Sequence, residues 1–123
     1  MKNIAIIGAS QDRNKFGNKA VRAFLQKGYT VYPVNPAGGE IEGLKAYKSI
    51  NEVPVNDLEM VSVYLHPPVV LKVVDDIAKK NVKELWLNPG SESPEAVAKA
   101  EKLGLTVIQA CSIVGVGVRP SEL

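Results

Sequence analysis

Apolar runs of strand length alternate with stretches of helical period along the chain, and this alternation limits the possible folds more than any other feature. The five runs span residues 3–7, 30–34, 60–65, 84–87 and 105–110. Strands that alternate with helices form βαβ units around a parallel sheet. The first run, NIAII, is apolar throughout, as expected for a strand that is covered on both faces. The sequence therefore predicts an α/β fold with a single doubly wound, parallel five-stranded sheet.

Three segments between these runs have the apolar period of an amphipathic helix. Val21, Phe24 and Leu25 share one face of the first segment. Residues 67–80 form the second, with apolar residues at positions i, i+3, i+4 and i+7. Ser93 begins the third, because serine is a preferred N-cap residue and is followed here by proline and glutamate. We expect one helix in each segment.

Residues 36–53 have no sustained helical face, and we expect a loop with a short extended piece at 44–47 and a helical turn at 49–53. Pro33 lies inside the second run, and we expect that strand to end near it because proline donates no ladder hydrogen bond. Short right-handed crossovers favour the strand order 3-2-1-4-5. In such sheets, ligands bind beyond the carboxyl ends of the strands, beside the first strand.

Length and charge exclude several classes of protein. A chain of 123 residues suits one compact domain over residues 1–123. The net charge of +2 is spread along the chain without a long basic run, so neither a nucleic acid nor a membrane surface is expected as a partner. The first apolar run is too short for a signal peptide or a membrane span, which predicts a cytoplasmic protein. Cys111 is the only cysteine, so neither an internal disulfide nor a metal site is expected.

The turn after the first run is the strongest candidate for a binding site. Small residues at Gly8-Ala9-Ser10 let a ligand approach the backbone, and Arg13, Lys15 and Gly17 follow before the next helix. The N–H groups at a helix start and the helix dipole both favour an anion. The alternative is an ordinary tight turn, but the added charge and access favour a phosphate-bearing ligand.

Two common phosphate motifs are absent from this stretch. The dinucleotide fingerprint G-x-G-x-x-G is broken, because eight residues separate Gly8 from Gly17 and Ser10 stands where the second glycine is expected. The second run ends in Asn35 and Pro36 rather than in the acidic residue that would bind the ribose of NAD. No Walker A sequence occurs. These absences disfavour NAD and nucleoside triphosphates.

Two long stretches carry a family resemblance. They are "IIGASQDRNKFGNKAVRAFLQKGYTVYPVNPAGGEIEGLKAYKSINEVP" and "VSVYLHPPVVLKVVDDIAKKNVKELWLNPGSESPEA". Together they resemble the small bacterial and archaeal CoA-binding proteins, single-domain relatives of the CoA-binding domain in the succinyl-CoA synthetase α subunit. The resemblance spans nearly the whole chain and implies a Rossmann-like domain with coenzyme A as its ligand.

The resemblance also implies where CoA binds. The turn after the first strand and the following helix start would lie under the diphosphate, the end of the second strand would shape the adenosine side, and the ends of the third and fourth strands would line the pantetheine arm. A basic, Gly-rich turn and a strand end that is polar but not acidic suit the same ligand without the resemblance. The expected CoA-binding residues are Gly8, Ala9, Ser10, Arg13, Lys15, Phe16, Gly17, Asn18, Asn35, Pro36, Leu65, His66, Pro67, Pro68, Asn88 and Gly90.

No complete catalytic constellation is evident in the sequence. Succinyl-CoA synthetases use a phosphorylated histidine on another domain and a nucleotide-grasp subunit, and this part of the resemblance does not carry over. The chain departs from the family at His66, where a small or apolar residue is more usual, and in its C-terminal tail, which lacks an acidic ending. We therefore expect non-catalytic binding of CoA or an acyl-CoA by a carrier, sensor or accessory protein, as a possible homodimer or with a partner enzyme.

Two other functions stay open from the residues alone. A small NADP-dependent enzyme or redox switch would use His66 or Cys111 as its reactive group, with Arg13 or Lys45 beside the 2′-phosphate. A pure interaction module would use Trp86, Tyr64 and the aliphatic tail, which could cover a dimer surface.

Overall fold

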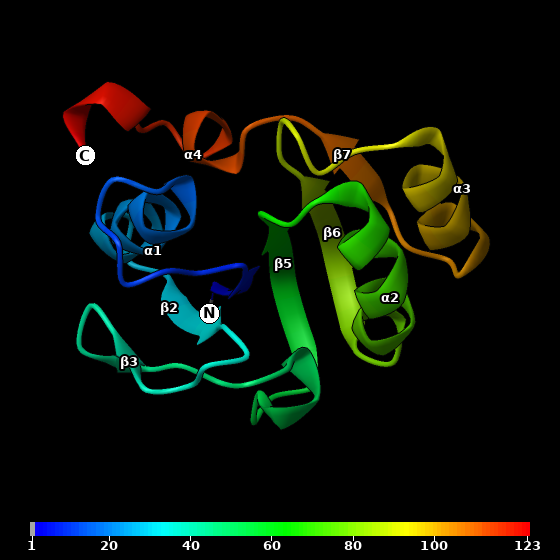
Figure 1. The fold of residues 1–123 in the computed structure, drawn as a ribbon, viewed down its shortest axis with the longest axis horizontal. Helices are drawn as coiled ribbons and strands as arrows, with labels where there is room; N and C mark the ends of the chain where they lie inside the picture. The colour runs from blue at the N-terminus through cyan, green and yellow to red at the C-terminus, as the bar shows by residue number, and fades with distance from the viewer. Residues whose placement is uncertain (1) are drawn as a thin grey trace.

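The computed structural model describes residues 2–123 as a parallel sheet with helices on both faces (Figure 1). The predicted α/β fold with five parallel strands is confirmed. In chain order the elements are β1 (Asn3–Ile7), α1 (Phe16–Gln26), β2 (Thr30–Val34), β3 (Glu40–Ile41), β4 (Leu44–Lys45), η1 (Ile50–Glu52), β5 (Asp57–Val63), α2 (Pro67–Ala78), β6 (Asn81–Leu87), α3 (Pro94–Lys102), β7 (Val107–Gln109), α4 (Ser112–Gly115) and η2 (Pro120–Glu122).

The strand order differs from the predicted one. The sheet runs β2-β1-β5-β6-β7, which is 2-1-3-4-5 for the five main strands rather than 3-2-1-4-5. Pro33 gives the physical reason. It lies within β2 opposite Ile6 of β1, and a proline without an N–H group suits an edge strand but not a strand that is paired on both sides. The predicted order would have put β2 inside the sheet.

Most element positions agree with the sequence pattern, but several boundaries and one buried position do not. β2 continues through Pro33 to Val34, β5 and β6 both begin three residues earlier than expected, and β7 is shorter. In α1, Phe24 is fully buried as expected, whereas Leu25 is 39% exposed. The short elements α4 and η2 have no counterpart in the sequence prediction.

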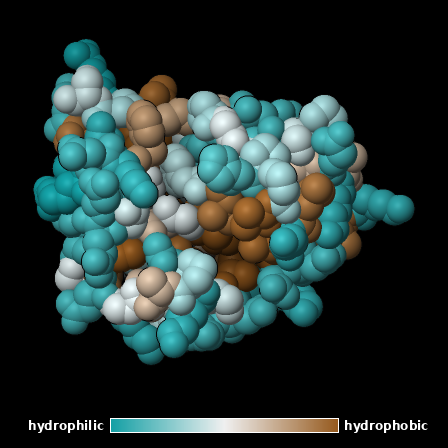
Figure 2. All heavy atoms as spheres, in the orientation of Figure 1, coloured by the Kyte–Doolittle hydropathy of each residue, from teal (hydrophilic) through white to brown (hydrophobic). Residues whose placement is uncertain are grey.

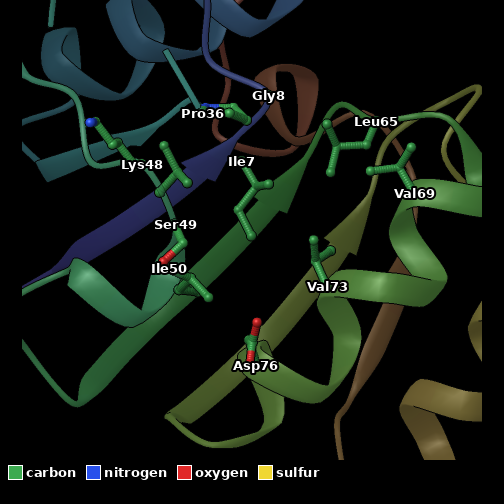
Figure 3. Close-up of a pocket in the computed structure, with 11 residues that line it drawn as sticks. Ile7, Gly8, Pro36, Lys48, Ser49, Ile50, Leu65, Val69, Val73 and Asp76 are labelled. Atoms are coloured by element: carbon green, nitrogen blue, oxygen red, sulfur yellow. The ribbon is translucent and has the colours of Figure 1, made fainter. Parts of the chain in front are cut away.

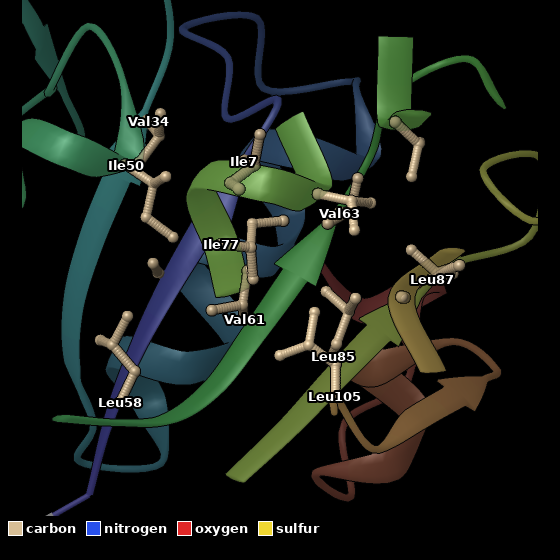
Figure 4. Packing of buried hydrophobic residues seen from close by; sticks show 14 of the residues in the cluster. Ile7, Val34, Ile50, Leu58, Val61, Val63, Ile77, Leu85, Leu87 and Leu105 are labelled. Carbon is tan, nitrogen blue, oxygen red and sulfur yellow. The ribbon is translucent and has the colours of Figure 1, made fainter. Parts of the chain in front are cut away.

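Each face of the sheet has its own apolar core, as a buried parallel sheet requires. Ala5 and Ile7 of β1 contact the core under α2 and α3 (Figure 4), whereas Ile4 and Ile6 contact the core under α1 and α4. Val118, close to the C-terminus, is buried in this second core. The aliphatic tail therefore folds against its own domain.

The connections that follow β1 and β2 run in opposite directions across the sheet. β2 lies on one side of β1, and the chain then crosses over to place β5 on the other side. The carboxyl ends of β1 and β5 are thus a topological switch point, where α/β sheets bind their ligands. Within residues 2–123, none of the helices is both long and apolar enough to cross a membrane.

Candidate ligand-binding site

Gly8 forms the tight turn that ends β1. Its φ of 89° is one that L side chains rarely adopt, and a Cβ atom there would collide with the carbonyl oxygen of Tyr64. The N–H groups of Gly8 and Ala9 both donate to the carbonyl oxygen of Val34, at 3.1 and 3.2 Å. The turn is therefore held between β2 and β5, and only glycine fits it.

Gly17 brings the start of α1 directly against this turn. A Cβ atom at Gly17 would collide with the carbonyl oxygen of Gly8. Lys15 is the N-cap residue of α1, and it makes no side-chain hydrogen bond to the first turn of the helix. The first N–H groups of α1 thus have no cap from the Lys15 side chain, and they lie close to the backbone of the turn. This geometry suits an anionic group of a ligand.

The side chain of Asn18 holds the loop between β1 and α1 from inside. It is fully buried, donates to the carbonyl oxygen of Ser10 at 2.9 Å and to Glu42 at 3.1 Å, and accepts from Arg22 at 2.8 Å. Asn18 therefore shapes the loop with a side chain whose hydrogen bonds are all internal. Its place at the helix start agrees with the sequence prediction, but contact of its side chain with a ligand does not follow.

Arg13 forms an ion pair with Glu42, at 2.6 Å between Nη1 and Oε1. Glu42 lies in the turn of the β3–β4 hairpin with a φ of 51°. The hydrogen bond from Asn18, followed by the charge of Arg13, lowers the pKa of Glu42 below its ordinary value although burial opposes this. Sequence reasoning missed Glu42, because 29 residues separate it from its partner Arg13.

Asn35 ties the loop after β2 to the turn after β1. Its Nδ2 donates to the carbonyl oxygen of Ala9 at 2.8 Å, and its Oδ1 accepts from the N–H group of Ala37 at 2.8 Å. A carboxylate at this position could not donate to Ala9. The structure thus gives Asn35 a local reason to be an amide.

An apolar pocket lies between these loops and α2. It has a volume of about 120 Å³, and its side chains come from β1, β2, η1 and α2 (Figure 3). In Figure 2, hydrophobic atoms gather in a hollow in the middle of the visible face. The apolar pocket is lined by Ile7, Gly8, Val34, Pro36, Lys48, Ser49, Ile50, Leu65, Val69, Val73 and Asp76.

Two further pockets continue from the apolar pocket along the carboxyl edge of the sheet. The arm groove, of about 330 Å³, shares Leu65 and Val69 with the apolar pocket and is lined by Tyr64, Leu65, His66, Val69, Pro89, Gly90 and Ser91. The tail pocket, of about 300 Å³, shares Tyr64 and Pro89 with the arm groove and is lined by Phe16, Tyr64, Asn88, Pro89, Cys111 and Pro120. The three pockets are therefore neighbours that share wall residues, and together they are called the crevice below.

A separate polar pocket lies on the other side of the turn after β1. It has a volume of about 350 Å³ and is lined by Ser10, Gln11, Asp12, Asn35, Ala37, Gly38, Gly39 and Ile41. Of the expected binding residues, Ser10 and Asn35 line this polar pocket. The crevice is lined by seven others, namely Gly8, Pro36, Leu65, His66, Gly90, Phe16 and Asn88. Ala9 is buried, Lys15 is exposed at the start of α1, and Pro67 and Pro68 begin α2 without lining any of these pockets.

A buried polar network forms the floor of the tail pocket. Asn88 donates to Ser62 at 2.8 Å and accepts from the N–H group of Ser112 at 2.8 Å, and the hydroxyl groups of Ser62 and Ser112 lie 2.8 Å apart. The hydroxyl group of Tyr64 lies 3.2 Å from that of Ser112, and burial raises the pKa of Tyr64 to about 12. Because the network joins the ends of β5 and β6 to the first residue of α4, which are distant in the sequence, the sequence pattern did not show it.

The two candidate reactive side chains lie in different parts of the crevice. His66 is exposed at the rim of the arm groove, just before α2, and its carbonyl oxygen accepts from the N–H groups of Val69 and Val70. Cys111 is half-buried in the tail pocket. Within residues 2–123, no cluster of three or more His, Cys, Asp or Glu side chains is arranged to hold a metal ion.

The fold is that of a Rossmann-like α/β domain, and the crevice lies beside the switch point of its parallel sheet. Residues 2–116 match the family described as "CoA binding domain", and the chain belongs to that family.

Relatives and solved structures agree with this family. The chain is 30% identical to the alpha subunit of ADP-forming acetate–CoA ligase I from Pyrococcus furiosus, over 99% of this chain and 29% of that one. It resembles the structure of a conserved hypothetical protein from Pyrococcus furiosus, with a TM-score of 0.84, 37% identity and coverage of 94% of this chain and 99% of that one.

A third match is a dinucleotide forming acetyl-coenzyme A synthetase 1 from Ca. Korarchaeum cryptofilum, solved in complex with phosphate and ADP. Its TM-score is 0.77 and its identity 32%, and the match covers 89% of this chain and 25% of that one. The chain thus spans less than a third of the length of both of these named CoA enzymes.

Proposed function

We propose that residues 1–123 act as one domain that binds CoA or an acyl-CoA in the crevice at the carboxyl ends of the strands, without catalysing a reaction. The observation that carries this proposal is the form of the site. A helix start without a side-chain cap lies against a tight glycine turn, and beside them lies the crevice of three neighbouring, mostly apolar pockets. CoA combines a charged diphosphate with a long, weakly polar arm, and so matches both parts.

The order of the strands suggests how the ligand lies. The diphosphate would contact the turn at Gly8 and the start of α1, with the adenosine side near Asn35 and Pro36. The pantetheine arm would follow the arm groove past Leu65 and Gly90. At the usual spacing of strands, the edge from β2 to β7 spans about 19 Å, which suits an elongated ligand.

The placement of His66 and Cys111 supports binding without catalysis. A histidine base or a cysteine nucleophile works together with a partner within hydrogen-bond reach. His66 lies in the arm groove and Cys111 in the tail pocket, and no hydrogen bond joins them within residues 2–123. Two named relatives of this chain are CoA enzymes in which the match covers 25–29% of the length. We infer that this chain carries only the CoA-binding part of such a process, as a carrier, a sensor or an accessory protein of a partner enzyme.

Isothermal titration of the purified protein with CoA, acetyl-CoA, NADH and NADPH tests the proposal. We expect saturable binding of CoA, weakened about fivefold by Lys15→Ala through the loss of one exposed charge contact. Asn35→Asp also weakens binding, because it removes the donor to Ala9 and places a negative charge beside the loop. Lys27→Ala, at the opposite end of α1, serves as the matched control and leaves the affinity unchanged. Saturable NADPH binding without CoA binding would contradict the proposal.

A further inference from the structure

The tail pocket is the part of the crevice on the α1 and α4 face of the sheet. Its residues come from five separate parts of the fold, namely the start of α1, the ends of β5 and β6, the residue before α4, and η2. It shares Tyr64 and Pro89 with the arm groove, so a ligand that lies in the groove and passes over these two residues would bring its far end to this pocket. In CoA that end is the thiol, and in an acyl-CoA it is the acyl group.

The lining of the tail pocket suits an apolar ligand group better than a charged one. Phe16, Tyr64, Pro89 and Pro120 present rings, Cys111 presents a thiol, and no lining residue carries a charge. Phe16 is 52% exposed, and Lys19 Nζ lies 5.2 Å from the centroid of its ring. An apolar group in this pocket would cover part of that ring.

The two other polar groups of the lining, the Asn88 amide and the Tyr64 hydroxyl, already have hydrogen-bond partners within the protein. The amide of Asn88 is bonded to Ser62, Val63 and Ser112, and the hydroxyl of Tyr64 lies within hydrogen-bond distance of Ser112. A carboxylate or another strongly polar group in the pocket would lose its water without gaining a free donor, which is unfavourable.

We propose that the tail pocket receives the acyl group of a bound acyl-CoA and selects apolar acyl chains over free CoA and over acyl chains that end in a carboxylate. This inference rests on the proposed function and adds the class of ligand to it. The pocket volume of about 300 Å³ corresponds to about ten water-sized groups, which is room for a short or medium acyl chain.

The affinities of CoA, acetyl-CoA, butyryl-CoA and hexanoyl-CoA, measured by isothermal titration, test the inference. We expect the affinity to rise from acetyl-CoA to hexanoyl-CoA by up to about fourfold for each buried methylene group. Succinyl-CoA is the matched ligand for butyryl-CoA, because both acyl chains have the same length and only succinyl ends in a charge. We expect it to bind at least about tenfold more weakly than butyryl-CoA.

Two variants locate the effect. Cys111→Phe places a ring inside the tail pocket, and we expect the ratio of hexanoyl-CoA to CoA affinity to fall close to one. Val114→Phe adds the same ring on α4 at a side chain that is 61% exposed and does not line the pocket, and we expect it to keep the wild-type ratio. Circular dichroism and the unfolding midpoint of each variant confirm that it is folded before its ratio is compared.

The outcomes separate this inference from the proposed function. Chain-length dependence that Cys111→Phe removes supports the acyl pocket. CoA binding with equal affinities for all acyl-CoAs, or with a dependence that Cys111→Phe leaves intact, overturns the acyl pocket and leaves CoA binding in place. Absence of binding for every CoA ligand overturns both.

Discussion

The loop between β1 and α1 and the loop between β6 and α3 occupy equivalent positions in the fold, but only the second ends in a residue whose side chain caps the next helix. Both follow a buried parallel strand, contain a glycine with positive φ, and lead into a helix. Ser93 caps α3, accepting from the N–H group of Ala96 at 3.1 Å, and Pro94 occupies the first turn. At α1, Lys15 stands at the N-cap position and supplies no such bond.

Gly8 and Gly90, the glycines of these two loops, differ in how closely other backbone approaches them. A Cβ atom at Gly90 would meet nothing within 4 Å, whereas one at Gly8 would collide with backbone. The loop before α3 thus satisfies its own helix, while the loop before α1 brings backbone close and leaves N–H groups uncapped. A strand-to-helix loop is therefore a candidate anion site where no side chain of the loop caps the helix that follows it.

Replacement of the two glycines should give the largest contrast. We expect Gly8→Ala to lower the free energy of unfolding by about 3 kcal/mol or more, because it combines a strained φ with a backbone collision. Gly90→Ala has the strained φ without the collision and should cost about 1 kcal/mol. Urea unfolding of the two variants measures the difference, and equal losses would refute this account of the β1 turn.

A new cap at α1 should separate stability from binding. In Lys15→Asp, the carboxylate would accept from the first turn of α1 and raise the free energy of unfolding by up to about 1 kcal/mol. The same carboxylate would compete with the diphosphate for those N–H groups, and we expect CoA affinity to fall by about tenfold or more. Unfolding and titration of one preparation test both parts. A variant that is stabilised and still binds CoA with full affinity would show that the ligand does not use this helix start.

Removal of the existing cap at α3 should give the reverse pattern. Ser93→Ala loses the hydrogen bond to the N–H group of Ala96, and we expect a loss of about 1 kcal/mol in the free energy of unfolding. CoA affinity should stay unchanged, because Ser93 lines none of the three pockets of the crevice. A parallel loss of affinity would mean that the ligand also uses the start of α3.

The ion pair that closes the β1–α1 loop should have the smallest effect. The folded state lowers the pKa of Glu42, so its contribution to stability is present above its ordinary pKa near 4.5 and is lost as the pH falls through the lowered value. We expect Glu42→Gln to cost less than about 1 kcal/mol at neutral pH, and the difference from wild type to shrink in acid. Unfolding curves at pH 7 and pH 3 check this, and a difference that grows in acid would contradict the direction of the shift.

The sequence predicted the fold class and the positions of the main elements, because apolar periodicity is a local signal. It also carried the information that the strand-order prediction failed to use. Pro33 required an edge strand, whereas the predicted order placed that strand inside the sheet. The local preference of Pro33 for an edge strand thus also restricts the order of the strands in the sheet.

The sequence predicted the backbone turn of the candidate site but not its polar side-chain network. Gly8 and Gly17 are visible because close backbone contact leaves only glycine as a choice. The network of Ser62, Asn88 and Ser112 is formed by polar residues from the ends of two strands and the start of α4, and no periodicity connects them. Asn18 was recognised by its position in the helix start, but its internal hydrogen bonds became apparent only in the structure.

Backbone amide shifts in a CoA titration followed by NMR test whether CoA binds at the uncapped start of α1. We expect large, saturable shifts at Gly8 and at the first residues of α1, and small ones at Ala96 in the capped start of α3. CoA binding that leaves the amides of Gly8, Phe16 and Gly17 unshifted would contradict it.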